Sequence, residues 1–128
     1  MNNLEGGNMN TLDLFRNEDK TEHYATGKTI FEQGQPGNKM YIIKEGNVDI
    51  NVGDQTVLSI GPGELLGEMA LIDTSARSAT AVASSDCQLI PIDERRFTYL
   101  VQQTPFFSIH VMRILVERLR KMNKIVNV

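Results

Sequence analysis

Residues 40–60, MYIIKEGNVDINVGDQTVLSI, hold three short runs of β-branched and aromatic residues, separated by glycine-containing turns. Val48, Ile50 and Val52 alternate with polar residues, which is the period of a strand with one solvent-exposed face. Gly53-Asp54 lies between two of the runs, in a pattern typical of a tight hairpin. The stretch therefore predicts antiparallel strands joined by short turns.

The same pattern extends from residue 24 to residue 92, where frequent glycines leave only short runs between turns. The runs predict strands at residues 28–31, 40–43, 48–52, 55–60, 80–83 and 87–92. Many short strands at this spacing are typical of a sandwich or a jelly-roll barrel. We therefore expect a mainly β fold, with a jelly-roll β-barrel over residues 24–92, preceded at 1–23 by a partly loose segment with a short helix.

The pattern changes after residue 92, because residues 93–123 contain no glycine and a single proline, Pro105. Asp93 is a good N-cap for a helix over 94–103, and Thr104-Pro105 is a typical start for a second, long helix. Two apolar stripes run along that helix, one with heptad spacing at Ile109, Met112, Val116, Leu119, Asn123 and Val126, and one at Val111, Leu115, Met122 and Ile125. We expect one stripe to pack on the barrel and the other to meet a partner helix, so that residues 93–128 form a hinge helix and a lid or dimer helix.

Composition excludes several classes of protein. The 128 residues carry a net charge of −3, which argues against a duplex nucleic-acid binder with a broad basic face. Cys87 is the only cysteine and lies in an apolar run, so we expect a buried, inert thiol and no thiolate zinc cluster. No run approaches the roughly 20 apolar residues of a membrane span, and residues 1–10 do not resemble a secretory signal. A cytoplasmic location without membrane or nucleic-acid contact is the expectation.

Residues 63–80, GELLGEMALIDTSARSAT, combine glycines, a carboxylate and an arginine with apolar residues. One or two helical turns between 64 and 72 would present unpaired N–H groups to an anion, and Gly67 would let a ligand approach bare backbone. If the loop at 73–76 folds back, Arg77 faces the same turn as Glu68. A guanidinium suits phosphate oxygens, whereas Glu68 needs a donor such as a sugar hydroxyl. The stretch therefore predicts a pocket for a phosphate joined to a sugar, although an exposed Glu68–Arg77 ion pair is the simpler alternative.

The residues 67–71, GEMAL, followed by 77–80, RSAT, resemble the phosphate-binding cassette of cyclic nucleotide-binding domains. Upstream, residues 27–34 and 37–48 resemble the paired glycine turns of the same family, so the resemblance covers about residues 24–123. It is strongest to the sensor half of the bacterial catabolite activator and fumarate-nitrate regulator group. A helix-turn-helix segment is absent from these 128 residues, so we expect no transcription-factor output.

The resemblance implies the role of each site residue. Glu68 would accept a hydrogen bond from the ribose 2′-OH, and Arg77 would pair with the cyclic phosphate. Backbone N–H groups near the glycine turn and after Arg77 would complete the phosphate cradle, aliphatic side chains would form an apolar wall, and the long helix would close over the base. The implied ligand-binding residues are Gly67, Glu68, Met69, Ala70, Arg77, Ser78, Ala79, Leu58, Ile60, Leu66, Met122 and Asn123.

The implied function is a non-catalytic sensor that binds a cyclic nucleotide and repositions its C-terminal helices. Ser78 favours cAMP, with cGMP as the other candidate, and no catalytic residue, metal or further cofactor is expected. We expect a homodimer through the 105–126 helix and an effector protein that the sequence does not identify. Asn123 is as well suited to setting the register of that dimer as to contacting a base.

Two alternatives remain open. One is an interaction module of the same fold that has lost its ligand or accepts another, such as a cyclic dinucleotide. The other is a jelly-roll metalloenzyme, for which two scattered histidines, His23 and His110, are too few. The basic cluster near the end of the long helix is interpreted as a solvated face, formed by Arg118, Arg120, Lys121 and Lys124.

Overall fold

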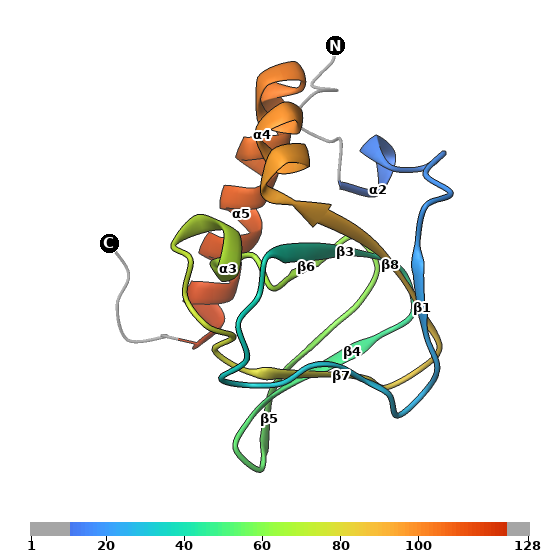
Figure 1. The fold of residues 1–128 in the computed structure, drawn as a ribbon, viewed down its shortest axis with the longest axis vertical. Coiled ribbons are helices and arrows are strands. Elements are labelled where there is room, and N and C mark those ends of the chain that lie inside the picture. The colour runs from blue at the N-terminus through green and yellow to red at the C-terminus, as the bar shows by residue number, and fades with distance from the viewer. Residues whose placement is uncertain (1–10, 123–128) are drawn as a thin grey trace.

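The computed structural model describes residues 11–122, and its strands form two four-stranded antiparallel sheets that face each other (Figure 1). The first sheet has the order β1 (Glu22–Tyr24), β8 (Cys87–Asp93), β3 (Lys39–Glu45) and β6 (Leu65–Leu66). The second has the order β2 (Thr29–Phe31), β7 (Thr80–Ala83), β4 (Val48–Val52) and β5 (Gln55–Ile60). The helices, gathered at one end of the barrel, are α2 (Thr11–Leu14), α3 (Met69–Ile72), α4 (Glu94–Gln103) and α5 (Pro105–Met122).

These sheets and C-terminal helices confirm the predicted jelly-roll fold, and every predicted strand is present within two residues of its expected bounds. Two strands were missed because they are very short. The three residues of β1 carry no apolar pattern, and they extend the barrel two residues upstream of its expected start. The predicted one or two helical turns between 64 and 72 are present as a single turn, but the sequence did not indicate that Leu65 and Leu66 before it pair with β3 as β6 and are buried. Only the last part of that segment, α3, is helical.

The residues of β3 point alternately into two separate cores, which explains its unbroken apolar run. Tyr41 and Ile43 face the barrel interior, where they pack with Val48, Leu66, Ala81, Ala83 and Leu89. Met40 and Ile42 face the helices, where they pack with Phe15, Leu65, Ile90, Ile92, Phe107 and Val111. Cys87 lies in the interior cluster, where its thiol donates a hydrogen bond to the carbonyl of Asn47. Burial raises the pKa of this thiol, as expected for an inert core cysteine.

The two C-terminal helices start where the sequence predicts. Asp93 caps α4 by accepting a hydrogen bond from the backbone N–H of Arg96 at 2.8 Å, and Pro105 is the first residue of α5. Phe107 and Val111 bury one face of α5 against the barrel, whereas its heptad seam is exposed at Ile109, Met112, Val116 and Leu119. The predictions for the Met122 side chain and for Asn123, Ile125 and Val126 lie outside the described residues. Within residues 11–122, no helix is both long and apolar enough to span a membrane.

Candidate ligand-binding site

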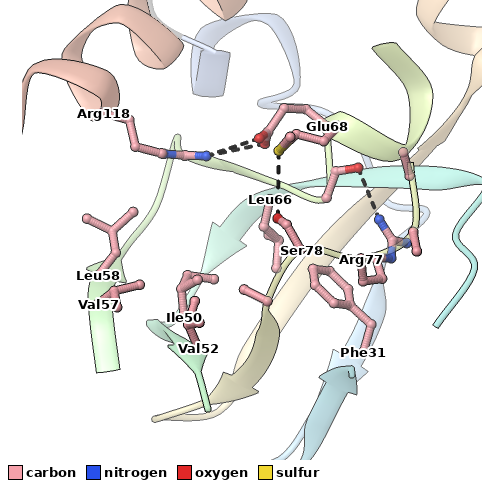
Figure 2. A pocket seen from close by; sticks show the side chains of 15 residues that line it. Phe31, Ile50, Val52, Val57, Leu58, Leu66, Glu68, Arg77, Ser78 and Arg118 are labelled. Carbon is pink, nitrogen blue, oxygen red and sulfur yellow. Dashed lines mark hydrogen bonds and ion pairs between the residues drawn. The ribbon is translucent and has the colours of Figure 1, made fainter. Parts of the chain in front are cut away.

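A cavity of about 330 Å³ lies at the junction of the α3 segment, the β4–β5 hairpin and α5 (Figure 2). Its lining residues come from five separate stretches of the chain, which extend from position 31 to position 118. The lining residues are Phe31, Ile50, Val52, Val57, Leu58, Leu66, Gly67, Glu68, Met69, Ala70, Ala76, Arg77, Ser78, Ala79 and Arg118. The cavity lining therefore includes residues 67–70 and 77–79 of the predicted cassette, together with residues that the sequence did not indicate.

Gly67 forms the turn that leads from β6 into α3. Its φ is 78°, in the left-handed region that glycine adopts without strain, and its carbonyl accepts a hydrogen bond from the N–H of Ala70 at 3.3 Å. A Cβ atom at this position would also lie 2.5 Å from Nη1 of Arg77. Both the backbone conformation and the close approach of the arginine therefore require glycine at position 67.

Arg77 is a buried cation at one end of the cavity, with only 8% of its surface exposed. Its Nη1 donates to the carbonyl of Gly67 at 3.0 Å and its Nη2 donates to the carbonyl of Lys39 at 2.8 Å, while Cζ lies 4.1 Å from the ring centroid of Phe31. Its Nε has no partner among the described residues. Burial lowers the pKa of Arg77, an effect that Tyr41 and Glu68 oppose, but arginine stays charged. The site thus holds a buried positive charge whose Nε donor has no partner among the described residues.

The loop before Arg77 folds back as predicted. The backbone N–H of Arg77 donates to the carbonyl of Gln35, and the carbonyl of Arg77 accepts from the N–H of Gly34, both at 2.8 Å. These two bonds attach the cassette to the upstream glycine turn. The prediction that Arg77 reaches the turn that carries Glu68 is confirmed, because the guanidinium of Arg77 donates to the carbonyl of Gly67, the residue before Glu68.

Glu68 is equally buried, with 6% of its surface exposed, but its partner is Arg118 of α5 and not Arg77. Nη1 of Arg118 lies 3.2 and 3.4 Å from the two carboxylate oxygens of Glu68. Nη2 of Arg118 donates to the carbonyl of Leu65 at 2.7 Å and to Glu64 at 3.3 Å. The alternative of an exposed Glu68–Arg77 ion pair is therefore wrong, and the carboxylate is instead linked to the long helix (Figure 2).

The interpretation of Arg118 as part of a solvated basic face is wrong, because only 16% of its side chain is exposed. Arg120 and Lys121 are exposed, as expected. The sequence did carry a signal for Arg118, since it follows Val111 and Ile114 by seven and four residues, which is the spacing of one helix face. Charge alone was a poor guide to which residues of α5 face the barrel.

The apolar wall is larger than predicted, and one of its predicted members is wrong. Leu58 and Leu66 line the cavity, but Ile60 is 6% exposed and packs inside the barrel core opposite Val48. Ile60 is the last residue of β5, two positions after Leu58, which is the last residue of that strand to line the cavity. The wall is completed by residues that the sequence analysis missed, namely Phe31, Ile50, Val52, Val57 and Ala76. Met122 and Asn123 are not tested, because their side chains lie outside the described part.

The comparison with known proteins agrees with this geometry. Residues 21–104 match the model of the cyclic nucleotide-binding domain. The chain belongs to this family. The resemblance inferred from the cassette residues is thus confirmed for the family as a whole.

Individual members of the cyclic nucleotide-binding domain family are also similar to the chain. It is 37% identical over 103 residues to the cyclic AMP receptor protein of Thermus thermophilus, covering 77% of this chain and 48% of that protein. A crystal structure of the Thermus thermophilus catabolite activator protein has a TM-score of 0.73 at 34% identity, over 88% of this chain and 55% of that one. A structure described as "A cyclic-GMP-dependent signalling pathway regulates bacterial phytopathogenesis" has a TM-score of 0.72 at 35% identity, over 86% and 91%. The chain spans about half the length of the Thermus relative, or less for others.

Proposed function

We propose that the chain is a non-catalytic sensor that binds a cyclic nucleotide, cAMP, in the cavity beside α3. The observation that carries the proposal is the buried Arg77, whose Nε lacks a partner among the described residues, at one end of a cavity that also contains the carboxylate of Glu68. A buried cation is stabilised by an anion, and a carboxylate by a hydroxyl donor. A cyclic phosphate fused to a ribose offers both groups within one rigid ring system.

In this proposal Arg77 binds the cyclic phosphate and Glu68 accepts a hydrogen bond from the ribose 2′-OH. Backbone N–H groups near Gly67, Ala70, Ser78 and Ala79 complete the phosphate cradle, with the Met69 side chain beside it. The base lies along the apolar wall formed by Leu66 and by the hairpin residues Ile50, Val52, Val57 and Leu58. This part of the wall consists of aliphatic side chains, so it supports burial of either purine without reading its edge.

The choice of cAMP over cGMP is supported by Ser78 and by the relatives. The Ser78 hydroxyl is exposed at the cavity and contacts only a weak acceptor there, the sulfur of Met69 at 3.6 Å, so it is available to a ligand oxygen. The Thermus relative is named a cyclic AMP receptor protein, whereas the structure described in terms of cyclic-GMP signalling makes cGMP the competitor to test.

The signalling step is proposed to pass through Arg118. Glu68 already accepts two hydrogen bonds from Arg118. A 2′-OH that binds Glu68 therefore shares or replaces these bonds, which changes how strongly α5 is bound to the barrel. A ligand shifts such an equilibrium only by its difference in affinity between the two helix positions. The exposed seam of α5 (Ile109, Met112, Val116 and Leu119) has heptad spacing, which supports a second copy of the chain as the partner that senses the shift, ahead of an effector protein.

Isothermal titration calorimetry with cAMP, cGMP and a cyclic dinucleotide tests the ligand. We expect saturable heat with cAMP, weaker binding of cGMP, and at least about 30-fold weaker cAMP binding by Arg77→Ala, since a charged hydrogen-bonded contact is lost. The matched control is Arg120→Ala, which removes an exposed arginine of α5 and leaves the affinity unchanged. Absence of heat from all three ligands, with a folded protein, would refute the proposal in favour of an interaction module that has lost its ligand.

A further inference from the structure

The guanidinium of Arg77 is enclosed by three segments of the chain. The ring of Phe31 on β2 lies beside it, with Cζ 4.1 Å from the ring centroid. The backbone of Gly67 approaches from the cassette, and the backbone of Gly37 approaches from the upstream turn. A Cβ on Gly37 would lie 2.8 Å from Nη2 and would overlap Nε and Cζ. We refer to Phe31, Gly37 and Gly67 as the arginine cage.

The two glycines of the cage exclude a side chain for different physical reasons. Gly67 has a φ of 78°, so a side chain there is strained whatever its surroundings. Gly37 is not among the glycines with a positive φ, and the three atoms nearest to a Cβ at this position all belong to the guanidinium of Arg77. The φ angle at position 37 therefore suits a residue with a side chain, and the nearest obstacle to one is the guanidinium of Arg77.

The cage holds the charge with groups that do not neutralise it. The two hydrogen bonds of the guanidinium go to backbone carbonyls, of Gly67 and of Lys39, and the face of Phe31 adds the attraction of its ring electrons. Carbonyls and a ring fix the position and plane of the guanidinium but leave its unit charge uncompensated. An anion that enters the cavity therefore meets a cation that is already oriented, which lowers the ordering cost of binding.

We propose that Phe31 and Gly37 are positioning residues for Arg77, and that they set the affinity of the cavity for an anionic phosphate by holding the guanidinium before the ligand arrives. This inference rests on the proposed function, because it takes Arg77 as the phosphate-binding residue. It makes Phe31 more than a wall residue, since its aromatic face acts on the charge of Arg77 and not only on the apolar part of the ligand.

The first test needs no ligand. Thermal unfolding is measured for the wild-type chain, Gly37→Ala, Arg77→Ala and the double variant. We expect Gly37→Ala to lower the melting temperature by roughly 4 to 10 °C in the wild-type background, as overpacking does in a chain of this size. In the Arg77→Ala background the shift should fall below about 2 °C, because the overlapping atoms are gone. Equal shifts in the two backgrounds would overturn the role of Gly37.

The second test separates charge from shape. Calorimetry compares cAMP with its neutral methyl phosphotriester in Phe31→Leu, which keeps apolar bulk, and in Phe31→Tyr, which keeps the aromatic face. We expect Phe31→Leu to weaken cAMP binding about 5- to 30-fold while changing triester binding less than about threefold, and Phe31→Tyr to restore cAMP binding. Gly37→Ala should show the same preference for the charged ligand. Equal losses for both ligands would mean that Phe31 only supports the wall, and would overturn its role.

The two tests also distinguish this inference from the proposed function. If the wild-type chain binds no cyclic nucleotide, the proposed function fails. The thermal unfolding of the four proteins still decides whether the Arg77 side chain is what excludes a side chain at position 37. If the wild-type chain binds cAMP and Arg77→Ala abolishes binding, but Phe31→Leu shows no charge-selective loss, the cage inference fails alone. Circular dichroism on each variant confirms that it is folded before binding is compared.

Discussion

Replacement of Arg118 by methionine is the most direct test of the site geometry, because it leaves the buried carboxylate of Glu68 without its cation. Arg118 bonds both oxygens of Glu68 and also contacts Glu64 and the carbonyl of Leu65. Methionine keeps the apolar stem of the side chain, so the loss is mainly electrostatic. The side chains of Arg118 and Glu68 are 16% and 8% exposed, whereas that of Glu64 is 39% exposed, so the Glu68 contact dominates.

The magnitude follows from this burial. Breaking a buried ion pair by removing one partner destabilises by about 3–5 kcal/mol, and the Arg118–Glu64 pair, in which one partner is 39% exposed, adds less than about 1 kcal/mol. Because Arg118 keeps some contact with solvent, we expect Arg118→Met to destabilise the ligand-free protein by about 3 kcal/mol. At this chain length that corresponds to a fall in the melting temperature of roughly 10 °C.

The assay is urea and thermal unfolding of four proteins: wild type, Arg118→Met, Glu68→Gln and the double variant. The double variant should recover a large part of the loss, because the side chain at position 68 that Arg118→Met leaves buried then carries no charge. Arg120→Met is the matched control, since that side chain is 63% exposed, and it should change stability by less than about 0.5 kcal/mol. A loss below about 1 kcal/mol in Arg118→Met, or strictly additive losses in the double variant, would refute the reasoning.

Three further predictions concern the helices. Asp93→Ala removes the side-chain cap of α4 and should lower the free energy of unfolding by about 1 kcal/mol, measured in urea; no change would show that the bond to Arg96 adds nothing. Burial, and to a smaller extent the charge of Arg113, lower the pKa of His110, whereas the charge of Asp13 raises it. The Nε2 atom of His110 has no partner among the described residues. The unfolded chain therefore takes up a proton first as pH falls through about 6.5, so stability should decrease below that pH, and less in His110→Asn; parallel pH profiles of the urea midpoint would contradict this. Leu119→Asp, at a side chain that is 63% exposed, should convert a dimer to a monomer in sedimentation velocity while the monomer stays folded; a wild-type chain that sediments as a monomer would contradict the seam proposal.

Much of the fold was predictable because local pattern and tertiary environment agree. Residues 48–52 alternate in sequence and form strand β4, which buries Val48, and Asp93 and Pro105 carry cap chemistry that acts within one helical turn. The failures occur where long-range pairing decides. Leu65 and Leu66 follow a turn and precede a helix, so nothing local marks them as a strand; their conformation comes from pairing with Tyr41 and Ile42, more than twenty residues away.

The site shows the same division. The cassette residues could be predicted because they lie within one short segment, whose glycine, acid and arginine have a joint chemical reason. The cage residues Phe31 and Gly37 could not. Helix spacing places Arg118 on the barrel face of α5, but its pairing with Glu68 could not be predicted, because each of these residues acts across the fold on a residue 40 or more positions away. The prediction for Ile60 was wrong because its neighbours in sequence were a poor guide to its position. It shares a strand with Leu58, but its place at the strand end puts it in the core and not at the cavity.

The two charged residues of the cavity are held in different ways, and the difference divides the proposed work between them. Arg77 is held by carbonyls and a ring, so an anion adds a contact to it without breaking an ion pair. Glu68 is held by Arg118, so a hydroxyl that binds it must compete with α5. Under the proposed function, the phosphate end would therefore supply affinity and the ribose end would couple occupancy to the helix. If Arg77 and Glu68 had paired with each other, a ligand would have to break that pair first and would have no direct link to α5.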